Sequence, residues 1–361
     1  MTATTGAYRA AYEASAANPE AFWMNAAEAI DWITDPTSAL DDSGAPVYRW
    51  FPGAELNTCF NAVDRHVLAG RGDQTAVIYD SAMTGVKDRF TYSELLDEVK
   101  AFAGVLVDQG VTKGDRVIIY LPMIPQAIIA MLACARIGAV HSVVFGGFAA
   151  NELAVRIDDA TPTVLVTASG GLEPGRTVEY LPMVAEALSL SKGSIHTVIV
   201  KERRNVPGTI KTYNGVNDVT WLDWDDAAAK VTPADCVPVL ATDPLYVLYT
   251  SGTTGKPKGI MRDNGGHAVA LTWSMANIYN IKPGEVMWAA SDVGCVVGHS
   301  YIVYAPLLAG ATTVIYEGKP VGTPDAGAFW RIVDEYKVRA LFTAPTALRA
   351  IRRVDPELKE L

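Results

Sequence analysis

Short runs of β-branched and apolar residues alternate with helix-length amphipathic stretches from Gln74 almost to the end of the chain. This alternation is typical of units in which a helix joins two parallel strands, and it predicts an α/β fold with mainly parallel sheets. Thr91 and Glu94 form the pattern of a capping box, which predicts a helix after Phe90 that ends near Gly110. The predicted strands are Thr75–Tyr79, Arg116–Leu121, Val140–Phe145, Thr163–Thr167, Thr197–Lys201, Leu245–Tyr249, Val286–Ala290, Thr312–Tyr316 and Ala340–Thr343.

The composition indicates a folded globular protein and argues against two classes of partner. The chain has 361 residues, of which 50% are hydrophobic and 19% are charged, so disordered and coiled-coil classes are excluded. Its net charge of −10 argues against nucleic acid or an anionic membrane surface as the main partner. Any site for phosphate groups must therefore be local.

Cysteine and histidine spacing predicts neither disulfides nor a metal site. The cysteines lie far apart, with no CxxC pair and no histidine at zinc-finger spacing: Cys59, Cys134, Cys236 and Cys295. Scattered single histidines are better explained as structural side chains: His66, His141, His196 and His267. The first thirty residues have no basic and apolar leader, and Pro122 and Pro125 interrupt the most apolar stretch. We therefore expect reduced thiols, a cytoplasmic location, no membrane span and no bound metal at these residues.

The chain divides into three parts on sequence pattern. Residues 1–60 form a lead-in rich in tryptophan, and an irregular stretch between Lys201 and Asp243 marks a boundary. This predicts a first α/β subdomain over residues 61–240 and the start of a second over residues 241–361. Each of the two subdomains should contribute one sheet to a layered body, the first sheet from about Asp73 to Lys201 and the second, incomplete, from Leu245 onward.

The strongest local motif is TSGTTGKPKG, which spans Thr250 to Gly259 directly after a predicted strand. Its glycines permit backbone N–H groups to converge on one anion, and its hydroxyls and Lys258 add donors, as a polyphosphate requires. It is not a Walker A loop, because Pro257 follows Lys256 where Ser or Thr would be needed. We expect a loop that closes over phosphates, with a polar surface turn as the alternative; Lys256 either touches phosphate or is a solvated lysine. The predicted phosphate-binding residues are Thr250, Ser251, Gly252, Thr253, Thr254, Gly255 and Lys258.

Together with three further stretches, this loop resembles the adenylate-forming acyl-CoA synthetases. SDVGCVVGHSY from Ser291 to Tyr301, and the segment from Gly318 to Thr346 that contains GKPVGTPDAGAFW and ends in FTAPT, are similar to the short-chain branch. AVHSVVFGGF from Ala139 to Phe148 continues the resemblance, and GLEPGR from Gly171 to Arg176 resembles propionyl-CoA synthetases more than acetyl-CoA synthetases. The resemblance implies the layered αβαβα sheets of the large N-terminal domain of that family.

The resemblance implies an AMP-forming acid–thiol ligase that uses ATP, CoA and Mg²⁺. An ionised short-chain carboxylate, propionate by the closest resemblance, attacks the α-phosphorus of ATP, and the CoA thiol then attacks the acyl-adenylate. The first step needs no general base, because a carboxylic acid with a pKa of about 4 to 5 is already ionised at pH 7. Positioning and charge stabilisation are then the tasks of the protein, and Lys258 is the expected catalytic residue of the phosphate loop.

The CoA site implied by the resemblance comprises Phe145, Gly147, Glu173, Arg176 and Val321. Phe145 would stack on the CoA adenine, Gly147 would allow CoA to approach the backbone, and Arg176 would pair with a CoA phosphate. Glu173 stands where acetyl-specific relatives have a second arginine and would weaken one phosphate contact. From the residues alone, a Gly-Gly turn with core phenylalanines is an equal alternative.

The acyl pocket implied by the resemblance comprises Cys295, Val296 and Val297, and His299 belongs to the same substrate region. Two valines would exclude long acyl chains by volume. Cys295 departs from the family, which usually has tryptophan there, so the pocket is enlarged or reshaped. Without the resemblance, an ordinary buried segment is the favoured interpretation of this stretch.

Several motifs of the family do not occur before Leu361: the Gly-Glu-Pro adenine segment, the aromatic run ending in Thr-Glu, the Thr-Gly-Asp ribose motif and the small domain with its adenylation lysine. The expectation is an incomplete N-terminal part of a longer ligase, weakly active or inactive alone, whose partner is its own missing C-terminal part. The alternative is a noncatalytic CoA- or nucleotide-binding module of the same fold. An α/β hydrolase is disfavoured, because the sequence around Ser300 lacks the second glycine of G-x-S-x-G.

Overall fold

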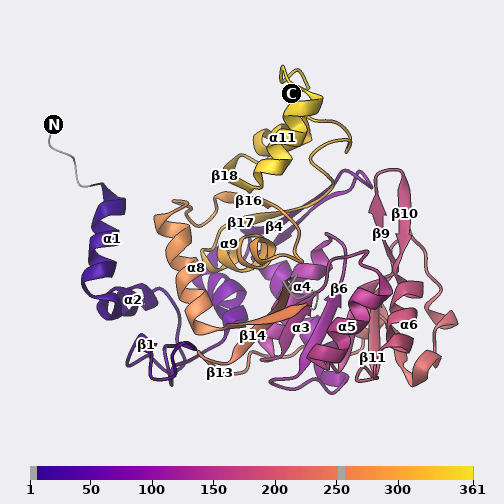
Figure 1. Ribbon diagram of the computed structural model, residues 1–361, viewed down its shortest axis with the longest axis horizontal. Coiled ribbons are helices and arrows are strands. Elements are labelled where there is room, and N and C mark those ends of the chain that lie inside the picture. The colour runs from indigo at the N-terminus through magenta and orange to yellow at the C-terminus, as the bar shows by residue number, and fades with distance from the viewer. Residues whose placement is uncertain (1–5, 251–256, 361) are drawn as a thin grey trace.

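The computed structural model describes residues 6–250 and 257–360, which build two large sheets separated and flanked by helices (Figure 1). The sequence pattern predicted nine strands, and a strand lies at each of these places. Within the described residues, the strands of the first large sheet are β6 (Arg116–Tyr120), β7 (Val140–Val143), β8 (Val164–Ala168), β11 (Thr197–Lys201), β12 (Thr220–Asp223), β14 (Pro244–Thr250) and β15 (Lys258–Asp263). Those of the second are β4 (Thr75–Ser81), β5 (Lys87–Thr91), β16 (Val286–Ala290), β17 (Thr312–Glu317) and β18 (Val338–Thr343).

The helices form three layers around the sheets. They are α1 (Ala7–Ala17), α2 (Pro19–Ala27), α3 (Tyr92–Asp108), α4 (Pro125–Arg136), α5 (Ala150–Ala160), α6 (Tyr180–Leu190), α7 (Trp224–Ala228), α8 (Gly265–Asn277), α9 (Ala305–Leu308), α10 (Ala328–Glu335) and α11 (Pro345–Val354). Helices α3, α4, α8 and α9 share the main core with both sheets, α5 and α6 cover the outer face of the first sheet, and α10 and α11 that of the second. This is the predicted αβαβα arrangement.

Strand residues alternate between the two cores as this layering requires. Val117 and Ile119 of β6 face the main core, whereas Ile118 and Tyr120 face α5 and α6. Successive side chains of a strand point to opposite faces, so a strand with helices on both sides must be apolar throughout. This explains why the strands read as continuous apolar runs in the sequence.

The division of strands between the sheets corrects the prediction from sequence. The first sheet has the order β12-β11-β8-β6-β7-β14-β15, so β14 and β15 from beyond residue 240 belong to it. The second has the order β18-β16-β17-β4-β5, so β4 and β5 from the predicted first subdomain belong to it. The chain crosses twice between the sheets, and hydrogen-bond pairing between distant strands decides membership in a way that sequence order does not reveal.

Local signals at α3 are confirmed. Thr91 Oγ1 accepts a hydrogen bond from Glu94 N at 3.2 Å, and Glu94 Oε2 accepts one from Thr91 N at 2.8 Å. Gly110, just beyond the helix, has a φ of +78°. Such capping contributes about 1 kcal/mol.

The lead-in segment lies at one side of the body, where α1 projects and α2 packs against α8 (Figure 1). Short two-residue strands follow: β1 (Leu40–Asp41), β2 (Arg49–Trp50) and β3 (Glu55–Leu56), the last paired with β13 (Val239–Leu240). A π-helical turn, η1 (Phe60–Asp64), then leads into the second sheet. Across residues 6–250 and 257–360, every helix is too short or too polar to cross a membrane.

Candidate functional site

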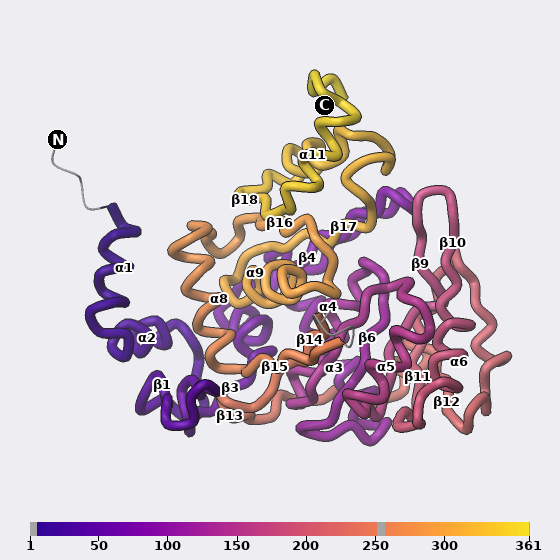
Figure 2. The backbone as a smooth tube through the Cα atoms, in the orientation of Figure 1, coloured from indigo at the N-terminus to yellow at the C-terminus, as the bar shows by residue number. Residues whose placement is uncertain are grey.

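A cavity of about 110 Å³ lies where the carboxyl ends of strands from both sheets meet. Open α/β sheets bind ligands at this edge, because loops and helix starts converge there. Residues that follow β4, β6, β7, β8, β16 and β17 line the cavity: Met83, Pro122, Met123, Gly146, Gly147, Gly171, Leu172, Glu173, Arg176, Val178, Tyr180, Asp292, Glu317, Gly318 and Lys319. Figure 2 shows the turn after β4 reaching toward the hairpin of β9 (Gly170–Glu173) and β10 (Arg176–Glu179).

The cavity lies at a topological switch point. Along the first sheet the strands β7-β6-β8-β11-β12 run parallel, and the chain moves from β6 to β7 on one side before it returns to β8 on the other. Loops that leave neighbouring strands in opposite directions open a crevice between them. Pro122 after β6, Gly147 after β7 and Gly171 after β8 line this crevice.

Two tyrosines hold the Gly-Gly turn that follows β7. Tyr120 Oη accepts a hydrogen bond from Gly147 N at 3.1 Å and donates one to Phe148 O at 2.8 Å. Burial raises the pKa of Tyr120 to about 12, so this hydroxyl keeps its proton. Gly147 has a φ of +88°, and a Cβ on Gly146 would lie 2.5 Å from Tyr180 Oη. Glycine is therefore required at both positions for different reasons.

The hairpin of β9 and β10 brings Glu173 and Arg176 to the cavity. Its turn has Pro174 at the second position and Gly175 at the third with a φ of +76°, which fits a type II turn. Arg176 is the register partner of Glu173, and its side chain is exposed at the cavity wall. Glu173 Oε1 lies 3.3 Å from the ammonium of Lys319, which extends from beyond β17.

A buried ion pair supports the cavity from below. Glu317, only 4% exposed, ends β17, and its Oε1 lies 2.8 Å from Nη1 of Arg203, which follows β11. Its Oε2 accepts hydrogen bonds from Arg203 Nη2 at 2.9 Å, Tyr79 at 2.7 Å and Ser81 at 2.8 Å. Burial and the neighbouring carboxylate raise the pKa of Tyr79 above its ordinary value. The pair joins the two sheets across the cavity.

Asp292 supplies a third carboxyl group to the cavity wall, besides those of Glu173 and Glu317. Burial raises its pKa above the ordinary value, and the hydrogen bond that Gly294 N donates to Oδ1 at 2.7 Å partly opposes this. The polar wall therefore combines cations from Arg176 and Lys319 with carboxyl groups from three segments. The cations of this wall can bind the phosphate groups of a ligand, and its carboxyl groups can accept hydrogen bonds from an uncharged polar part of the same ligand.

The predicted phosphate loop joins two antiparallel strands. Thr250 ends β14 and is the register partner of Lys258, which begins β15, and both side chains are exposed. Tyr246 of β14 pairs with His141 of β7, so Thr250 lies level with the Phe145 end of β7. The loop therefore leaves the sheet at the same edge as the cavity. Ser251, Gly252, Thr253, Thr254, Gly255 and Lys256 lie outside the described residues.

The predicted acyl-pocket residues occupy the turn between β16 and the π-helical segment η5 (Gly298–Tyr304). Val296 is 46% exposed, and Val297 is half-buried against the main core. Cys295 Sγ lies 3.0 Å from Ser291 Oγ and donates to Asp292 O at 3.1 Å. The turn thus adjoins the cavity through Asp292, although Cys295, Val296 and Val297 are not among the lining residues of the cavity.

Three predicted site residues lie away from the cavity wall. His299 is 0% exposed, so the expected contact with substrate is not open in this conformation; its Nδ1 lies 3.0 Å from Cys295 O. Phe145 is half-buried and stacks on Phe148 at 5.3 Å between ring centroids. Val321 packs with the outer core of the second sheet.

Sequence reasoning missed the residues that hold the cavity together: Tyr120, Tyr180, Arg203, Asp292, Glu317 and Lys319. Each lies at or just beyond the carboxyl end of a strand, or begins the next helix. A charged residue that directly follows a buried parallel strand was the available signal for Glu317. Nothing in the pattern could indicate that Arg203 is its partner, because 114 residues separate them.

Comparison with known proteins matches most of the chain. Residues 64–361 match the family described as AMP-binding enzyme, and residues 8–62 match the acetyl-coenzyme A synthetase N-terminus. The chain belongs to the AMP-binding enzyme family. Its described fold is similar to the structure of acetoacetyl-CoA synthetase from Streptomyces lividans, with a TM-score of 0.86 and 29% sequence identity over 96% of this chain and 52% of that one.

Curated relatives of this AMP-binding family member are short-chain acyl-CoA synthetases. Acyl-CoA synthetase short-chain family member 3, mitochondrial, from Mus musculus is 56% identical over 98% of this chain and 51% of its own length. Propionate–CoA ligase from Salmonella typhimurium is 44% identical over 95% of this chain and 54% of its own length. The chain thus spans about half the length of the curated relatives that it matches.

Proposed function

We propose that this chain supplies the CoA site and the ATP phosphate loop of an AMP-forming ligase that activates a short carboxylate, propionate first among the candidates. The observation that carries the proposal is the cavity, where Gly147, Glu173 and Arg176 from two separate segments meet. The sequence predicts all three of these residues as members of a CoA site. The names of the relatives support the same class of reaction.

The residues present fit an anionic thiol ester carrier such as CoA. A Cβ on Gly146 or Gly171 would collide with Tyr180, and the positive φ of Gly147 favours glycine there. The absence of side chains at these three positions lets a ligand approach the main chain. The exposed guanidinium of Arg176 and the ammonium of Lys319 can each pair with phosphate oxygens. Glu173 already neutralises Lys319, which reduces the positive charge available to phosphate.

In the proposed reaction, a carboxylate oxygen forms a bond to the α-phosphorus of ATP while the bond to pyrophosphate breaks. The CoA thiol gives its proton to water, its sulfur bonds to the acyl carbon, and AMP leaves with both electrons of the acyl–oxygen bond. Lys258 would stabilise phosphate charge during the first step, from the strand that follows the loop. Mg²⁺ bound to ATP would share that charge. Val296 and Val297 would limit acyl length, and Cys295 would admit more than acetate.

The roughly half-length match to the relatives keeps a second function open, a noncatalytic CoA-binding module of the same fold. Both functions need the cavity, but only the ligase needs adenylate formation. Propionate-dependent exchange of labelled pyrophosphate into ATP separates them. It is measured with this chain beside any longer chain that its gene encodes.

CoA binding tests the cavity directly. Arg176→Ala should lower the affinity of this chain for CoA by about tenfold, the effect of one lost phosphate pair. Glu173→Arg should tighten binding several-fold, because it frees Lys319 and adds a cation. Arg352→Ala, an exposed position on α11, is the control. Calorimetric titration with CoA measures all three, and equal affinities for wild type, Arg176→Ala and Glu173→Arg would refute the assignment of the cavity.

A further inference from the structure

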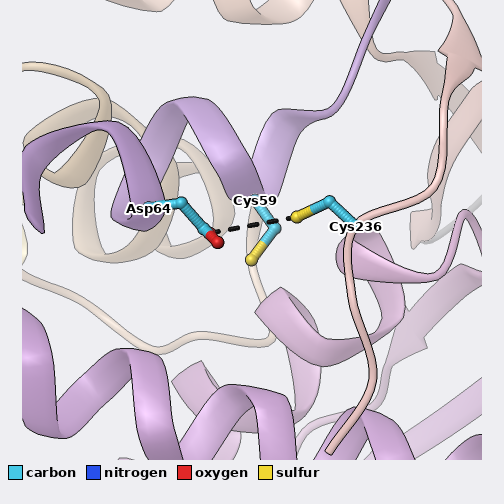
Figure 3. Close-up of side chains that lie close together, drawn as sticks. All are labelled: Cys59, Asp64 and Cys236. Carbon is cyan, nitrogen blue, oxygen red and sulfur yellow. Dashed lines mark hydrogen bonds between the residues drawn. The ribbon is translucent and has the colours of Figure 1, made fainter. Parts of the chain in front are cut away.

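A second cluster of reactive side chains lies far from the cavity, beneath the amino end of β7. Cys59, Asp64 and Cys236 bring two sulfur atoms and a carboxylate oxygen within 4.8 Å of one another. Figure 3 shows the three side chains converging from two segments, the start of η1 and the connection that precedes β13. Cys236 Sγ lies 3.9 Å from Asp64 Oδ2, although 172 residues separate them.

The π-helical turn is what places Cys59 and Asp64 on one face. An α-helix completes a turn in 3.6 residues, so positions five apart point in different directions. A π-helix closes its hydrogen bond five residues along, and positions five apart then lie one turn above each other. Arg65 N donates to Phe60 O in this manner. Such turns recur at functional sites.

Cys236 is held in place by its neighbours. Asn57 Nδ2 donates to three carbonyl oxygens, those of Ala135 at 3.2 Å, Arg136 at 2.9 Å and Val237 at 2.8 Å. Arg136 Nε donates to Ala234 O at 2.7 Å. The end of α4, the start of η1 and the segment around Cys236 are therefore fixed to one another independently of the thiols.

Charge balance decides what the cluster can accept. The Arg136 guanidinium is 2% exposed, and its Nη1 lies 3.0 and 2.8 Å from the two oxygens of Asp64 and 3.8 Å from Cys59 Sγ. With both thiols protonated, the arginine and the carboxylate sum to zero. Replacing the two thiol protons with one divalent cation leaves that sum at zero, so the exchange buries no extra charge.

We propose that Cys59, Cys236 and Asp64 bind a thiophilic divalent cation, Zn²⁺ by preference, with water as the fourth ligand and Arg136 hydrogen-bonded to the ligand set. Zinc–ligand bonds of about 2.3 Å to sulfur and 2.0 to 2.2 Å to oxygen place tetrahedral ligand atoms about 3.6 to 3.8 Å apart. The separation of 3.9 Å between Cys236 Sγ and Asp64 Oδ2 is close to this spacing. Two thiolates select zinc over the hard cations Mg²⁺ and Ca²⁺.

The ion would connect the end of the lead-in, at Cys59, to the segment around Cys236, which lies near the boundary between the two predicted subdomains. Its role would be structural, because it would join Cys59 and Asp64 to Cys236, which lies more than 170 residues further along the chain. The sequence did not predict this site, since metal-binding motifs are recognised by short spacing and these ligands come together only in the fold.

Cobalt titration of the full 361-residue chain, reduced and stripped of metal, tests the proposal. Co²⁺ should bind in a one-to-one ratio and give the sulfur-to-cobalt charge-transfer absorption that is typical of thiolate ligands. Added Zn²⁺ should displace the Co²⁺ and so abolish this absorption. Cys236→Ser should lose the absorption. Cys134→Ala, a buried thiol outside the cluster, is the matched control and should keep it. Zinc should also raise the melting temperature of wild type and Cys134→Ala but not of Cys236→Ser.

Two results would overturn the proposal. One is a cobalt complex without charge transfer, or with charge transfer that Cys236→Ser leaves unchanged while circular dichroism shows both proteins folded. The other is a count of two free thiols instead of four in the denatured, unreduced chain with a mass lower by two hydrogens, and a proteolytic peptide in which Cys59 is joined to Cys236; the two hydrogens would then have passed to an oxidant such as a peroxide.

Discussion

The two ends of the first sheet use polar residues in opposite ways. At the carboxyl end, glycine turns and exposed charges surround a cavity, and Arg176 faces solvent there. Near the amino ends of β7 and β14, His141, His267 and His299 are packed into the core beside Tyr246 and Tyr304. The first end keeps its charges available to a ligand, whereas the second keeps its titratable groups neutral.

Neutral histidines at the buried end depend on close packing. The rings of Tyr246 and His299 lie 4.6 Å apart, and His141 Nε2 lies 2.7 Å from Tyr304 Oη. Burial lowers the pKa of His299 to about 4 and that of His267 to about 3, and lowers that of His141 well below its ordinary value. A proton on any of these rings would therefore oppose folding. We therefore expect low pH to destabilise this end of the sheet before the carboxyl end.

The largest expected effect is acid destabilisation. A histidine in the unfolded chain has a pKa of about 6.5, so between this value and the lower folded value the unfolded state binds more protons. Stability is then complete above pH 6.5 and falls as the pH drops. Between pH 7.5 and 5, each buried histidine should cost about 2 kcal/mol, and the three together about 6 kcal/mol. Urea unfolding at pH 5, 6 and 7.5 measures the loss.

A histidine variant shows whether these rings cause the effect. His299→Asn keeps a donor toward Cys295 O but cannot titrate, so the pH dependence of the unfolding free energy should weaken by about one third of the histidine contribution. His196→Asn, at an exposed position, is the control. An unchanged pH dependence in a folded His299→Asn protein would assign the acid sensitivity to other groups.

The second-largest expected effect concerns the buried ion pair between Arg203 and Glu317 beside the cavity. Glu317→Gln leaves the Arg203 guanidinium buried without its carboxylate, which should cost about 3 to 5 kcal/mol. The double variant Arg203→Leu/Glu317→Leu removes both charges. Its loss of unfolding free energy should be smaller than the sum of the losses in the single variants Arg203→Leu and Glu317→Leu. Additive costs in urea unfolding would show that the pair does not couple the sheets.

The comparison also explains how far sequence reasoning could reach. Strands such as β6 and β17 were predicted close to their bounds, because burial on both faces makes them continuous apolar runs. Sheet membership was not predictable in this way, since β14 and β4 pair with strands from the other half of the chain. The layered fold followed from the family resemblance, which encodes those pairings.

For the candidate site, sequence reasoning found residues that line the cavity better than the residues that support it. Glycine turns and an arginine after a turn are local features, so Gly147 and Arg176 could be selected from a short motif. The pairing of Glu317 with Arg203, and the approach of Cys236 to Cys59, depend on contacts between segments far apart in the chain. Local patterns contain no information about such contacts.

The smallest expected effect separates two glycines that meet the same tyrosine. A Cβ on Gly146 would lie 2.5 Å from Tyr180 Oη and 3.0 Å from Leu121 O, whereas one on Gly171 would lie 2.4 Å from Oη and 2.9 Å from Cζ. Either alanine variant should lose about 1 to 3 kcal/mol of unfolding free energy. Tyr180→Phe removes the hydroxyl but not the ring, so it should restore more stability to Gly146→Ala than to Gly171→Ala, whose Cβ would still meet the ring. Equal rescue of both in thermal unfolding would mean that the hydroxyl contact is not what requires glycine at position 146.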